Sequence, residues 1–319
     1  MRALEAPLAG IGPDNAGMKH QTSILAAALL LAAAVSAHAQ APADTLAKLK
    51  ASGEILLGNR DAAVPFSFLI DGKPHGYTVD MCQELVKRLQ VRIGLKDLKV
   101  KWVTLSAAQR LPAVQSGQVD LECGNTTNTT KRRELVSFTA PIFIAGAGVL
   151  VRSELGVKTL ADLRGKKVAV AASTTAERVV QRANEAQLAL TPVIVKDNAA
   201  AFAALDSGQV EAWMTDDILL AAYRAQANDP KRFELLAKRH TIEPLALTLR
   251  KNDKAFEDAV DAELKAMYRE GRAVALYQRW FLQPIPPKGV VLDLPPSRML
   301  RELFRQPVKV DLDSDVVVL

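Results

Sequence analysis

Residues 111–124 read Leu-Pro-Ala-Val-Gln-Ser-Gly-Gln-Val-Asp-Leu-Glu-Cys-Gly, and residues 202–215 read Phe-Ala-Ala-Leu-Asp-Ser-Gly-Gln-Val-Glu-Ala-Trp-Met-Thr. The two stretches share Ser-Gly-Gln-Val at the same place. Each copy predicts a helix that ends at its glycine and is followed by a strand. Because this joint is common in α/β proteins, the shared Ser-Gly-Gln-Val is weak evidence alone. Asn125 and Asp216, however, both stand eight residues after that glycine. The matched flanks and offset indicate two similar sheets in one chain.

The rest of the chain alternates short apolar runs with amphipathic stretches. Residues 54–58 and 100–103 predict buried strands, and residues 80–89 and 111–115 predict helices. Strands joined by helices in this rhythm predict parallel sheets with helices on both faces, which is an α/β fold. Ligands of open α/β sheets bind at the carboxyl ends of the strands. Two such edges that face each other would form a cleft able to close by hinge motion.

The composition excludes several classes of protein. The 319 residues suffice for two domains, and 49% hydrophobic with 24% charged residues is typical of a globular chain. The net charge of +6 is scattered, and aromatic residues are only 5%, whereas nucleic-acid binding needs a concentrated basic surface with stacking aromatics. Metal-ligand spacings and phosphate-binding or nucleophile motifs are missing from the sequence. We therefore expect no nucleic acid, metal, cofactor or catalytic site.

The N-terminus predicts export. A basic start at residues 19–20 precedes an apolar run at residues 24–35 and the small-x-small sequence Ala-His-Ala at 37–39, the pattern of a secretory signal peptide. The run is shorter than the roughly 20 residues of a membrane span, although an uncleaved anchor stays an alternative. The residues before Met18 fit no export signal, so translation is expected to begin there. We expect a signal peptide within residues 1–39 and a periplasmic mature protein.

Export also bears on the two cysteines, Cys82 and Cys123. An oxidising periplasm favours a disulfide between them. Two separate buried thiols stay an alternative, because the separation of the Cα atoms is not contained in the sequence.

Short motifs in a distinctive order run from about Thr45 to Phe304. They are Gly-Asn-Arg at 58–60, Val-Pro-Phe-Ser-Phe at 64–68, Gly-Tyr-Thr-Val-Asp at 76–80, Arg-Leu-Pro at 110–112, Glu-Cys-Gly-Asn-Thr-Thr-Asn at 122–128, Phe-Thr-Ala-Pro at 138–141, Asp-Leu-Arg-Gly-Lys at 162–166, Ser-Thr-Thr at 173–175, Asp-Asp at 216–217, Trp-Phe at 280–281 and Pro-Ile-Pro-Pro at 284–287. In this order they resemble the periplasmic solute-binding proteins of polar amino acid ABC importers (bacterial extracellular solute-binding protein family 3), in particular the glutamate/aspartate-binding type.

The resemblance implies a two-lobed fold, with a mixed sheet and flanking helices in each lobe. It implies a monomer that closes on a free amino acid and delivers it to an inner-membrane ABC permease and ATPase complex. The expected organisation is lobe one at residues 44–147 and 246–302, lobe two at 148–245, hinge strands near 148–152 and 245–250, one long helix over 253–283, and a loosely held tail at 303–319.

A free amino acid carries a carboxylate and an ammonium group, and both are costly to bury unpaired. Arg110 suits the α-carboxylate, because the planar guanidinium offers two parallel hydrogen bonds and Pro112 marks a helix start that adds backbone N–H donors. A surface ion pair is the alternative for Arg110. Asp216 would neutralise the ammonium group from the second lobe, with Asp217 as its competitor.

The resemblance also implies hydrogen-bonding residues in both lobes. Asn125, Thr126 and Thr127 would contact the ligand from lobe one, unless they form an ordinary turn. Thr174 and Thr175 would give hydroxyl and N–H donors to the carboxylate from lobe two, unless they only cap a helix.

Selectivity for the ligand side chain depends on a further set of positions. In the resemblance, Arg60 meets a side-chain carboxylate, and Arg132 adds a second positive charge unless it is solvated. Asn125 stands where the glutamate/aspartate type usually has Ser, and Asn198 where it has a His that reaches this carboxylate. The missing His weakens the case for an acidic ligand, because Asn serves an amide or a carboxylate, but glutamate or aspartate is still expected first. Alternatives are glutamine, asparagine or a related dicarboxylate, a receptor that signals to a membrane sensor, and a dehydratase-like enzyme on the same fold.

Overall fold

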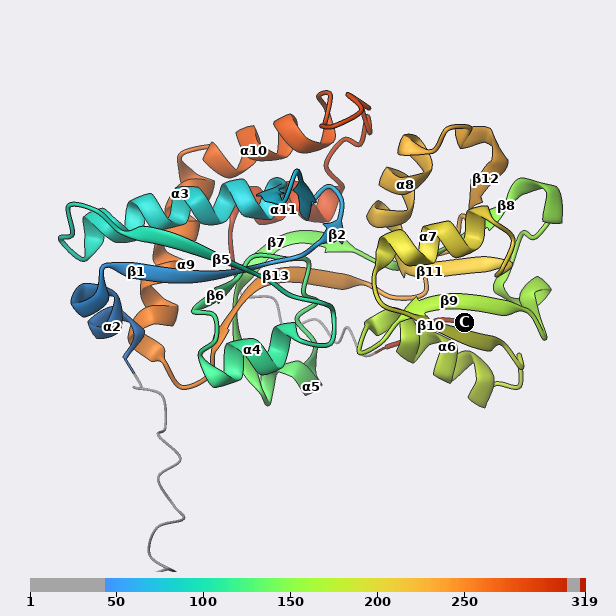
Figure 1. Cartoon of the computed structure of the whole chain (residues 1–319), viewed down its shortest axis with the longest axis horizontal. Coiled ribbons are helices and arrows are strands. Elements are labelled where there is room, and N and C mark those ends of the chain that lie inside the picture. Colours follow the sequence, from blue (N-terminus) through green and yellow to red (C-terminus); the bar gives the residue numbers. More distant parts are fainter. Residues whose placement is uncertain (1–43, 309–315) are drawn as a thin grey trace, which may run out of the picture. The chain divides into compact units, whose positions relative to one another are not determined.

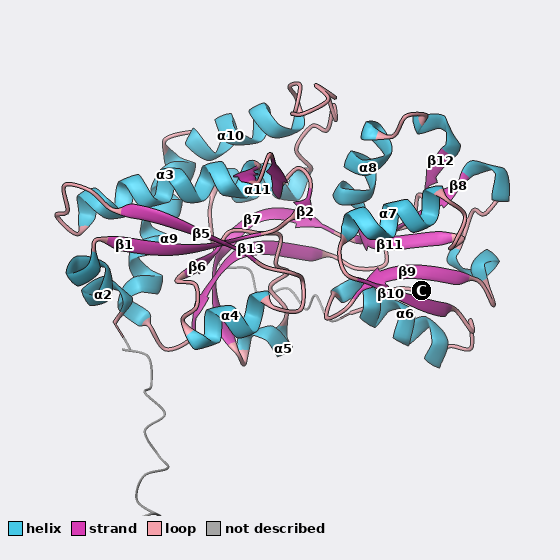
Figure 2. Cartoon of the chain, in the orientation of Figure 1, coloured by secondary structure: helices cyan, strands magenta, loops and turns pink. Residues whose placement is uncertain are grey.

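The computed structural model describes residues 44–308 and 316–319 (Figure 1). The expected signal peptide at residues 1–39 and the expected start at Met18 lie outside these residues. Over the described ranges, none of the helices combines the length and apolar character needed to span a membrane. Helices and strands alternate along the chain, and the strands build two five-stranded mixed sheets, so the predicted α/β class is confirmed (Figure 2).

The first sheet has the strand order β5-β1-β6-β13-β7. Its strands are β1 (Glu54–Asn59), β5 (Lys99–Thr104), β6 (Leu121–Glu122), β7 (Val136–Ala145) and β13 (Glu243–Arg250). β1 runs parallel to β5 and β6, whereas β13 is antiparallel to β6 and β7. The strands predicted at 54–58 and 100–103 are therefore confirmed, with β1 in the centre of the parallel part.

Helices cover both faces of this sheet. One face packs in a single apolar cluster with α2 (Thr45–Ser52), α3 (Tyr77–Arg92), α9 (Lys254–Arg269), α10 (Arg272–Phe281) and α11 (Arg298–Arg305). The other face packs against α4 (Arg110–Ser116), and the short α5 (Thr130–Arg133) contacts β7. Met81, Leu85, Val86 and Leu89 of α3 are all buried. This is the helical stripe that the sequence predicted.

The single helix expected over residues 253–283 is wrong, because the structure has two helices there. α9 ends at Arg269 and α10 begins at Arg272. Gly271 between them has φ +75°, a left-handed conformation that glycine adopts without steric cost. The break lets α10 turn back so that it packs on both α3 and α9.

The second sheet has the order β10-β9-β11-β8-β12. Its strands are β8 (Ala147–Arg152), β9 (Lys167–Ala171), β10 (Thr191–Val195), β11 (Ala212–Asp216) and β12 (Phe233–Leu235). Alternate residues of β8 face opposite ways, as a strand requires. Val149 and Val151 pack with α6 (Thr175–Glu185), while Leu150 packs with α7 (Asn198–Asp206) and α8 (Asp217–Gln226).

The two sheets share one plan, which confirms the repeat inferred from Ser-Gly-Gln-Val. The chain runs β1-α3-β5-α4-β6 in the first sheet and β9-α6-β10-α7-β11 in the second. In both, the first of the three parallel strands lies in the middle, and an antiparallel strand follows the third. Gly117 and Gly208 both adopt left-handed φ angles, of +76° and +80°. The two copies of the motif therefore occupy the same place in each sheet.

Small elements complete the described chain. A three-stranded sheet follows β1, and three short 3-10 helices lie near the second sheet: β2 (Ala62–Ala63), β3 (Ser67–Ile70), β4 (Lys73–His75), η1 (Ser153–Leu155), η2 (Leu160–Leu163) and η3 (Pro230–Arg232).

The chain passes between the two sheets at Gly146 and again in residues 236–242. The expected hinge strands at 148–152 and 245–250 each lie within one sheet, so the crossings come just before them. A Cβ atom on Gly146 would stand 2.5 Å from the carbonyl oxygen of Thr241. The two crossing segments can therefore run in contact only because residue 146 is glycine. The exact bounds of the two lobes stay a prediction.

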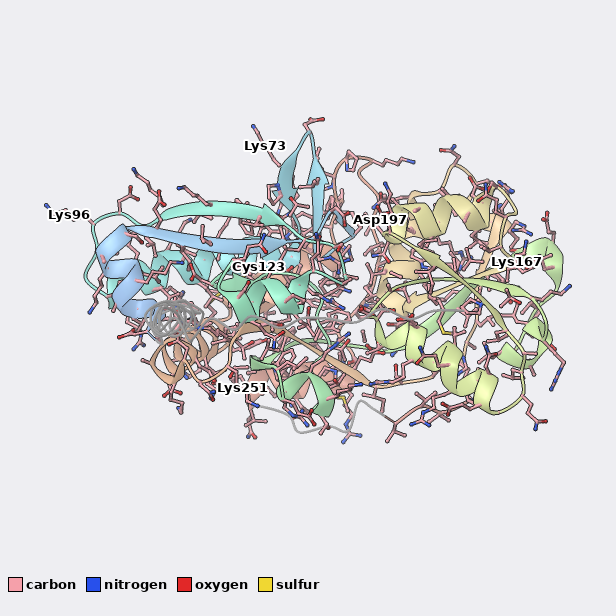
Figure 3. All side chains as sticks on the ribbon, turned by 60° about the horizontal axis from the view of Figure 1, so that its bottom comes forward. Lys73, Lys96, Cys123, Lys167, Asp197 and Lys251 are labelled. Atoms are coloured by element: carbon pink, nitrogen blue, oxygen red, sulfur yellow. A yellow bond between two sulfur atoms is a disulfide. The ribbon has the colours of Figure 1, made fainter. Side chains whose placement is uncertain are left out.

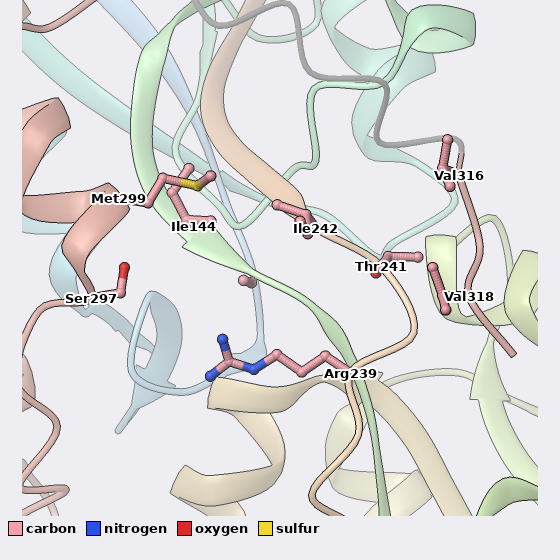
Figure 4. A pocket seen from close by; sticks show the side chains of 9 residues that line it. Ile144, Arg239, Thr241, Ile242, Ser297, Met299, Val316 and Val318 are labelled. Atoms are coloured by element: carbon pink, nitrogen blue, oxygen red, sulfur yellow. The ribbon is translucent and has the colours of Figure 1, made fainter.

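The C-terminal residues are attached more firmly than expected. The loosely held tail was expected from residue 303, but α11 continues to Arg305 and Leu303 is buried. Beyond it, Val318 N–H donates to His240 O at 2.8 Å, and Val318 O lies 2.8 Å from His240 Nδ1. A groove of about 420 Å³ lies between Met299 of α11 and Val318 (Figure 4). The last described residues thus bind the second crossing segment.

The predicted disulfide between Cys82 and Cys123 is confirmed. Cys82 lies on α3 and Cys123 directly follows β6, with Cα atoms 6.3 Å apart (Cys123 is labelled in Figure 3). Both residues are fully buried in the core under the first sheet. The bond ties α3 to the strand end that leads into Asn125.

Replacing both cysteines by serine should lower the free energy of unfolding by about 4 kcal/mol, because the bond closes a loop between residues 41 positions apart. Urea denaturation of the mature protein measures this. The unsubstituted protein in the presence of a reducing agent is the control and should show the same loss. An unchanged midpoint in both would contradict the prediction.

Candidate functional site

Polar side chains from both sheets line one small cavity. The space open to the centre of a water molecule is about 20 Å³, so the opposing walls already lie close together. The lining residues are Arg60, Ala107, Arg110, Asn125, Thr127, Ala171, Thr174, Thr175, Ala176, Asn198, Thr215 and Asp216. Eight of the ten residues predicted for the site are in this set, and Thr126 and Arg132 are not.

The fold explains why these residues meet. Arg60, Asn125 and Asp216 stand at or just after the carboxyl ends of β1, β6 and β11, the edge at which parallel sheets bind ligands. Arg110, Thr175 and Asn198 are the first residues of α4, α6 and α7. Backbone N–H groups are exposed at such helix starts and favour negatively charged ligand groups.

Arg110 is the side chain most in need of an anion. The residue is only 3% exposed, and its Nε and Nη1 atoms have no hydrogen-bond partner among the described residues. Burial, together with the positive charges of Arg132 and Arg60, lowers the pKa of Arg110 to about 9. It therefore remains a cation at neutral pH. The alternative of a surface ion pair is excluded, because Arg110 is not on the surface.

The structure separates Asp216 from its competitor. Asp216 lines the cavity and accepts a hydrogen bond from Asn125 Nδ2 at 2.8 Å. Burial, and next the negative charge of Glu243, raise the pKa of Asp216 to about 7. Asp217 instead pairs with Arg239 at 2.5 Å and accepts from the N–H of Gly146 at 3.1 Å. Asp217 thus supports the crossing segments.

Asn125 connects groups of opposite charge. Its Oδ1 accepts from Arg60 Nη1 at 3.2 Å, while its Nδ2 donates to Asp216. Arg60 Nε also donates to Leu105 O at 3.0 Å, so this guanidinium is held in place from two sides. Asn125 follows the first sheet and Asp216 ends a strand of the second. The amide is therefore a bridge between the two halves of the cavity wall.

Asn198 makes a second bridge. Its Nδ2 donates to Ala62 O at 3.0 Å, and Tyr223 OH donates to the same oxygen at 3.0 Å. Ala62 belongs to β2 beside the first sheet, whereas Asn198 and Tyr223 belong to helices on the second. Asn198 thus places an uncharged amide at the position where the resemblance implies a histidine.

The two predicted residues outside the cavity support its walls. Thr126 is fully buried and donates to Glu122 Oε2 at 2.8 Å, which holds the loop after β6. Arg132 is buried rather than solvated, and donates to Thr127 O and Ser173 O at 3.0 Å each. Burial is the first cause that lowers the pKa of Arg132. It lies beside the cavity and joins its two walls.

The hydroxyl groups of Thr174 and Thr175 already have acceptors. Thr174 caps α6, with Oγ1 accepting from Glu177 N and donating to Ala171 O, as in the alternative of a helix cap. Thr175 Oγ1 donates to Glu243 Oε2 at 2.8 Å. Hydroxyl donation to a carboxylate, expected for both, would require these bonds to be exchanged. The backbone N–H groups at the start of α6 are the donors that remain.

Glu243 is the residue that sequence reasoning missed. It is fully buried behind the cavity, at the start of β13, and its charge affects both Asp216 and Arg132. In the sequence it is a single acidic residue between Ile242 and Pro244, without a pattern that marks it.

Among the described residues, no group of three or more His, Cys, Asp or Glu side chains could hold a metal ion.

Comparison with known proteins identifies the family. Residues 55–283 match the sequence pattern of the bacterial extracellular solute-binding proteins, family 3. The L-glutamate/L-aspartate-binding protein of Pseudomonas aeruginosa is 37% identical over 292 residues, which cover 89% of this chain and 97% of that protein. The glutamate/aspartate import solute-binding protein of Escherichia coli K12 is 34% identical over 293 residues, covering 91% and 97%.

Solved structures agree in fold. An ancestral arginine-binding protein bound to arginine has a TM-score of 0.65 and 28% identity, and covers 72% of this chain and 98% of its own. An ancestral amino acid-binding protein, a precursor of cyclohexadienyl dehydratase, has a TM-score of 0.64 and 30% identity, covering 74% and 99%. The two sheets are thus the two lobes of the periplasmic-binding-protein fold. The chain belongs to the bacterial extracellular solute-binding proteins of family 3.

Proposed function

We propose that the protein is the periplasmic receptor of an ABC importer, and that it closes its two lobes on free glutamate or aspartate. One observation carries this proposal. A buried arginine with unused donors, Arg110, and a buried carboxylate, Asp216, line the same cavity from opposite lobes. These are the two groups that the α-carboxylate and the α-ammonium of an amino acid require.

In this proposal the α-carboxylate binds Arg110 and the N–H groups at the start of α6. The helix dipole adds to the attraction, since Thr175 is the first residue of that helix. The ammonium group binds Asp216. It either replaces the amide of Asn125 as the hydrogen-bond donor to this carboxylate or donates beside it. Both lobes then contact one ligand, so that binding stabilises the closed form.

The positive charge around the cavity favours an acidic side chain. Arg60, Arg110 and Arg132 are all buried at or beside it, and the two neighbours lower the pKa of Arg110. A second carboxylate on the ligand would reduce this repulsion. The names of the relatives from Pseudomonas aeruginosa and Escherichia coli point to the same ligands.

Glutamine or asparagine is the second candidate, and the amides of Asn125 and Asn198 in the cavity wall favour it. An amide side chain both donates and accepts, so it can pair with a ligand amide. Three curated relatives that are 34–37% identical to this chain are named as binding proteins. The neighbour that is a precursor of a dehydratase is itself named as amino acid-binding. We therefore favour binding over catalysis, and delivery to a permease and ATPase over signalling to a membrane sensor.

The ligand can be identified with the mature protein, from residue 40, and the twenty amino acids. We expect a clear rise in melting temperature with glutamate or aspartate, and calorimetry should give a Kd on the order of 1 µM, equivalent to about 8 kcal/mol. A response to glutamine or asparagine alone would support the second candidate. Turnover of a substrate, or no response to any amino acid, would contradict the proposed function as an amino acid receptor.

Replacing Arg110 by methionine should weaken binding by at least about 100-fold, because hydrogen bonds to charged groups contribute about 1.5–3 kcal/mol each. Arg110→Lys should recover only part of the affinity, since it keeps the charge but not the planar fork. Calorimetry measures both. Arg182→Met is the control, because Arg182 is an exposed residue of α6 paired with Glu185. An equal loss of affinity in the control and in the Arg110 variants would contradict the role of Arg110 in binding the α-carboxylate.

The affinity should depend on pH through Asp216. Its raised pKa, about 7, means that a proton must leave before the carboxylate can pair with an ammonium group. Each pH unit below about 7 should therefore weaken binding by about tenfold, and binding should level off above it. The free energy of unfolding of the unliganded protein should change with pH in the opposite direction. The folded form holds this proton more tightly than the unfolded chain, so stability should fall as pH rises from about 4 to about 7.

Asp216→Asn is the matched control for both slopes. It should bind weakly and with little dependence on pH over this range. A wild-type affinity that is flat between about pH 5 and pH 7 would contradict the prediction, and a slope that persists in Asp216→Asn would assign the dependence to another group.

A further inference from the structure

Glu243 receives three hydroxyl hydrogen bonds at the point where the chain returns to the first sheet. Its Oε2 accepts from Thr127 Oγ1 at 2.6 Å and from Thr175 Oγ1 at 2.8 Å. Its Oε1 accepts from Thr241 Oγ1 at 2.6 Å. The carboxylate is 0% exposed and lies outside the set of residues that line the cavity. It acts on the cavity through its threonine neighbours.

A single oxygen atom of Glu243 thus joins the two walls of the cavity. Thr127 follows β6 of the first sheet, and Thr175 begins α6 on the second. Thr241 extends the connection, because its Oγ1 accepts from the N–H of Ala147, the residue directly after the other crossing at Gly146. Both walls and both crossing segments are therefore linked to one buried carboxylate.

These bonds decide what the threonine hydroxyls can offer to a ligand. A hydroxyl group has one proton to donate and two lone pairs that accept. Thr127 and Thr175 both line the cavity, and both give their only hydroxyl proton to Glu243. Their oxygens can then only accept hydrogen bonds from the side of the cavity. Acceptors suit an ammonium group, whereas they repel a carboxylate.

We propose that Glu243 is a positioning residue: it holds the hydroxyl proton of Thr127, whose oxygen then accepts from the ligand's ammonium group, and the hydroxyl proton of Thr175, which then offers the α-carboxylate only its backbone N–H. The inference rests on the proposed function, since it assumes that an amino acid occupies the cavity. It also places the polarity of the site under the control of a residue that does not touch the ligand. Asp216 and the hydroxyl oxygen of Thr127, which both line the cavity, then form its ammonium-binding part.

The test compares L-glutamate with glutarate, which has the same two carboxylates but no ammonium group. Wild-type protein should bind glutamate much more tightly than glutarate. In Glu243→Ala the hydroxyl protons are released, so glutamate should bind more weakly while glutarate binding is kept or improved. The ratio of the two Kd values, measured by calorimetry, should fall by at least about tenfold. A merely structural role would weaken both ligands equally, and that result would overturn the inference.

Glu122→Ala is the matched control. Glu122 is also fully buried and also accepts a threonine hydroxyl, from Thr126, but Thr126 does not line the cavity. This variant should leave the ratio unchanged even if it lowers stability. Thr241→Val removes the bond to Oε1 and the acceptor of the Ala147 N–H, but it keeps both threonine bonds to Oε2, so it should leave the ratio unchanged too. A tenfold fall of the ratio in either control would also overturn the inference.

A measurement on the ligand-free protein covers the case in which Glu243→Ala does not fold. The hydroxyl protons of Thr127 and Thr175 should appear in NMR spectra of the wild type as slowly exchanging signals, because the buried carboxylate holds them. Fast exchange of both would overturn the inference. A wild type that shows these signals but binds neither glutamate nor any other amino acid would instead overturn the proposed function, so the two failures can be told apart.

Discussion

Buried charge is the constraint on which the rest of this structure depends. Three arginines and three carboxylates are buried at or around one cavity: Arg60, Arg110, Arg132, Glu122, Asp216 and Glu243. Charges removed from water are costly unless they are paired and hydrogen-bonded. Most of these side chains are held by amides, hydroxyls or carbonyl oxygens from both sheets. Two buried atoms of Arg110, Nε and Nη1, are donors without partners, and this is why the cavity suits an anion; the other partnerless buried atom among these six side chains, Glu122 Oε1, is an acceptor.

The crossing segments allow these charges to be shared between two sheets. Gly146 brings the first crossing against the carbonyl of Thr241 in the second, where no side chain would fit. Asp217 and Arg239 pair beside this contact, and His240 binds the backbone of Val318. The same few residues therefore connect the hinge region to the C-terminus and to Glu243. Any movement of one lobe relative to the other must bend the chain within this hydrogen-bonded region.

Membership of the family sets the general function, but the ligand depends on a few side chains. Asn125 and Asn198 place uncharged amides in a wall that also contains Arg60. An amide tolerates either a carboxylate or another amide, so these positions set selectivity less strictly than a charged residue would. Among the charged side chains that line the cavity itself, the two arginines Arg60 and Arg110 outnumber the one carboxylate, Asp216, and this excess of positive charge is the physical basis of the proposed preference for acidic ligands.

The sequence by itself determined the duplicated α/β plan and the family, and it favoured a disulfide between Cys82 and Cys123, which the structure decided by bringing their Cα atoms to 6.3 Å. The fixed offset after each glycine located Asn125 and Asp216, because the position of a residue relative to a strand end follows from local periodicity. The resemblance to the family supplied most of the other cavity residues. Tertiary structure alone decided that Asp217 supports a crossing segment, and that residues 253–283 form two helices. It also revealed Glu243, whose partners Thr127 and Thr175 are 116 and 68 residues away in the chain. Hydrogen bonds over such separations depend on how the two sheets are joined, and no local pattern records that.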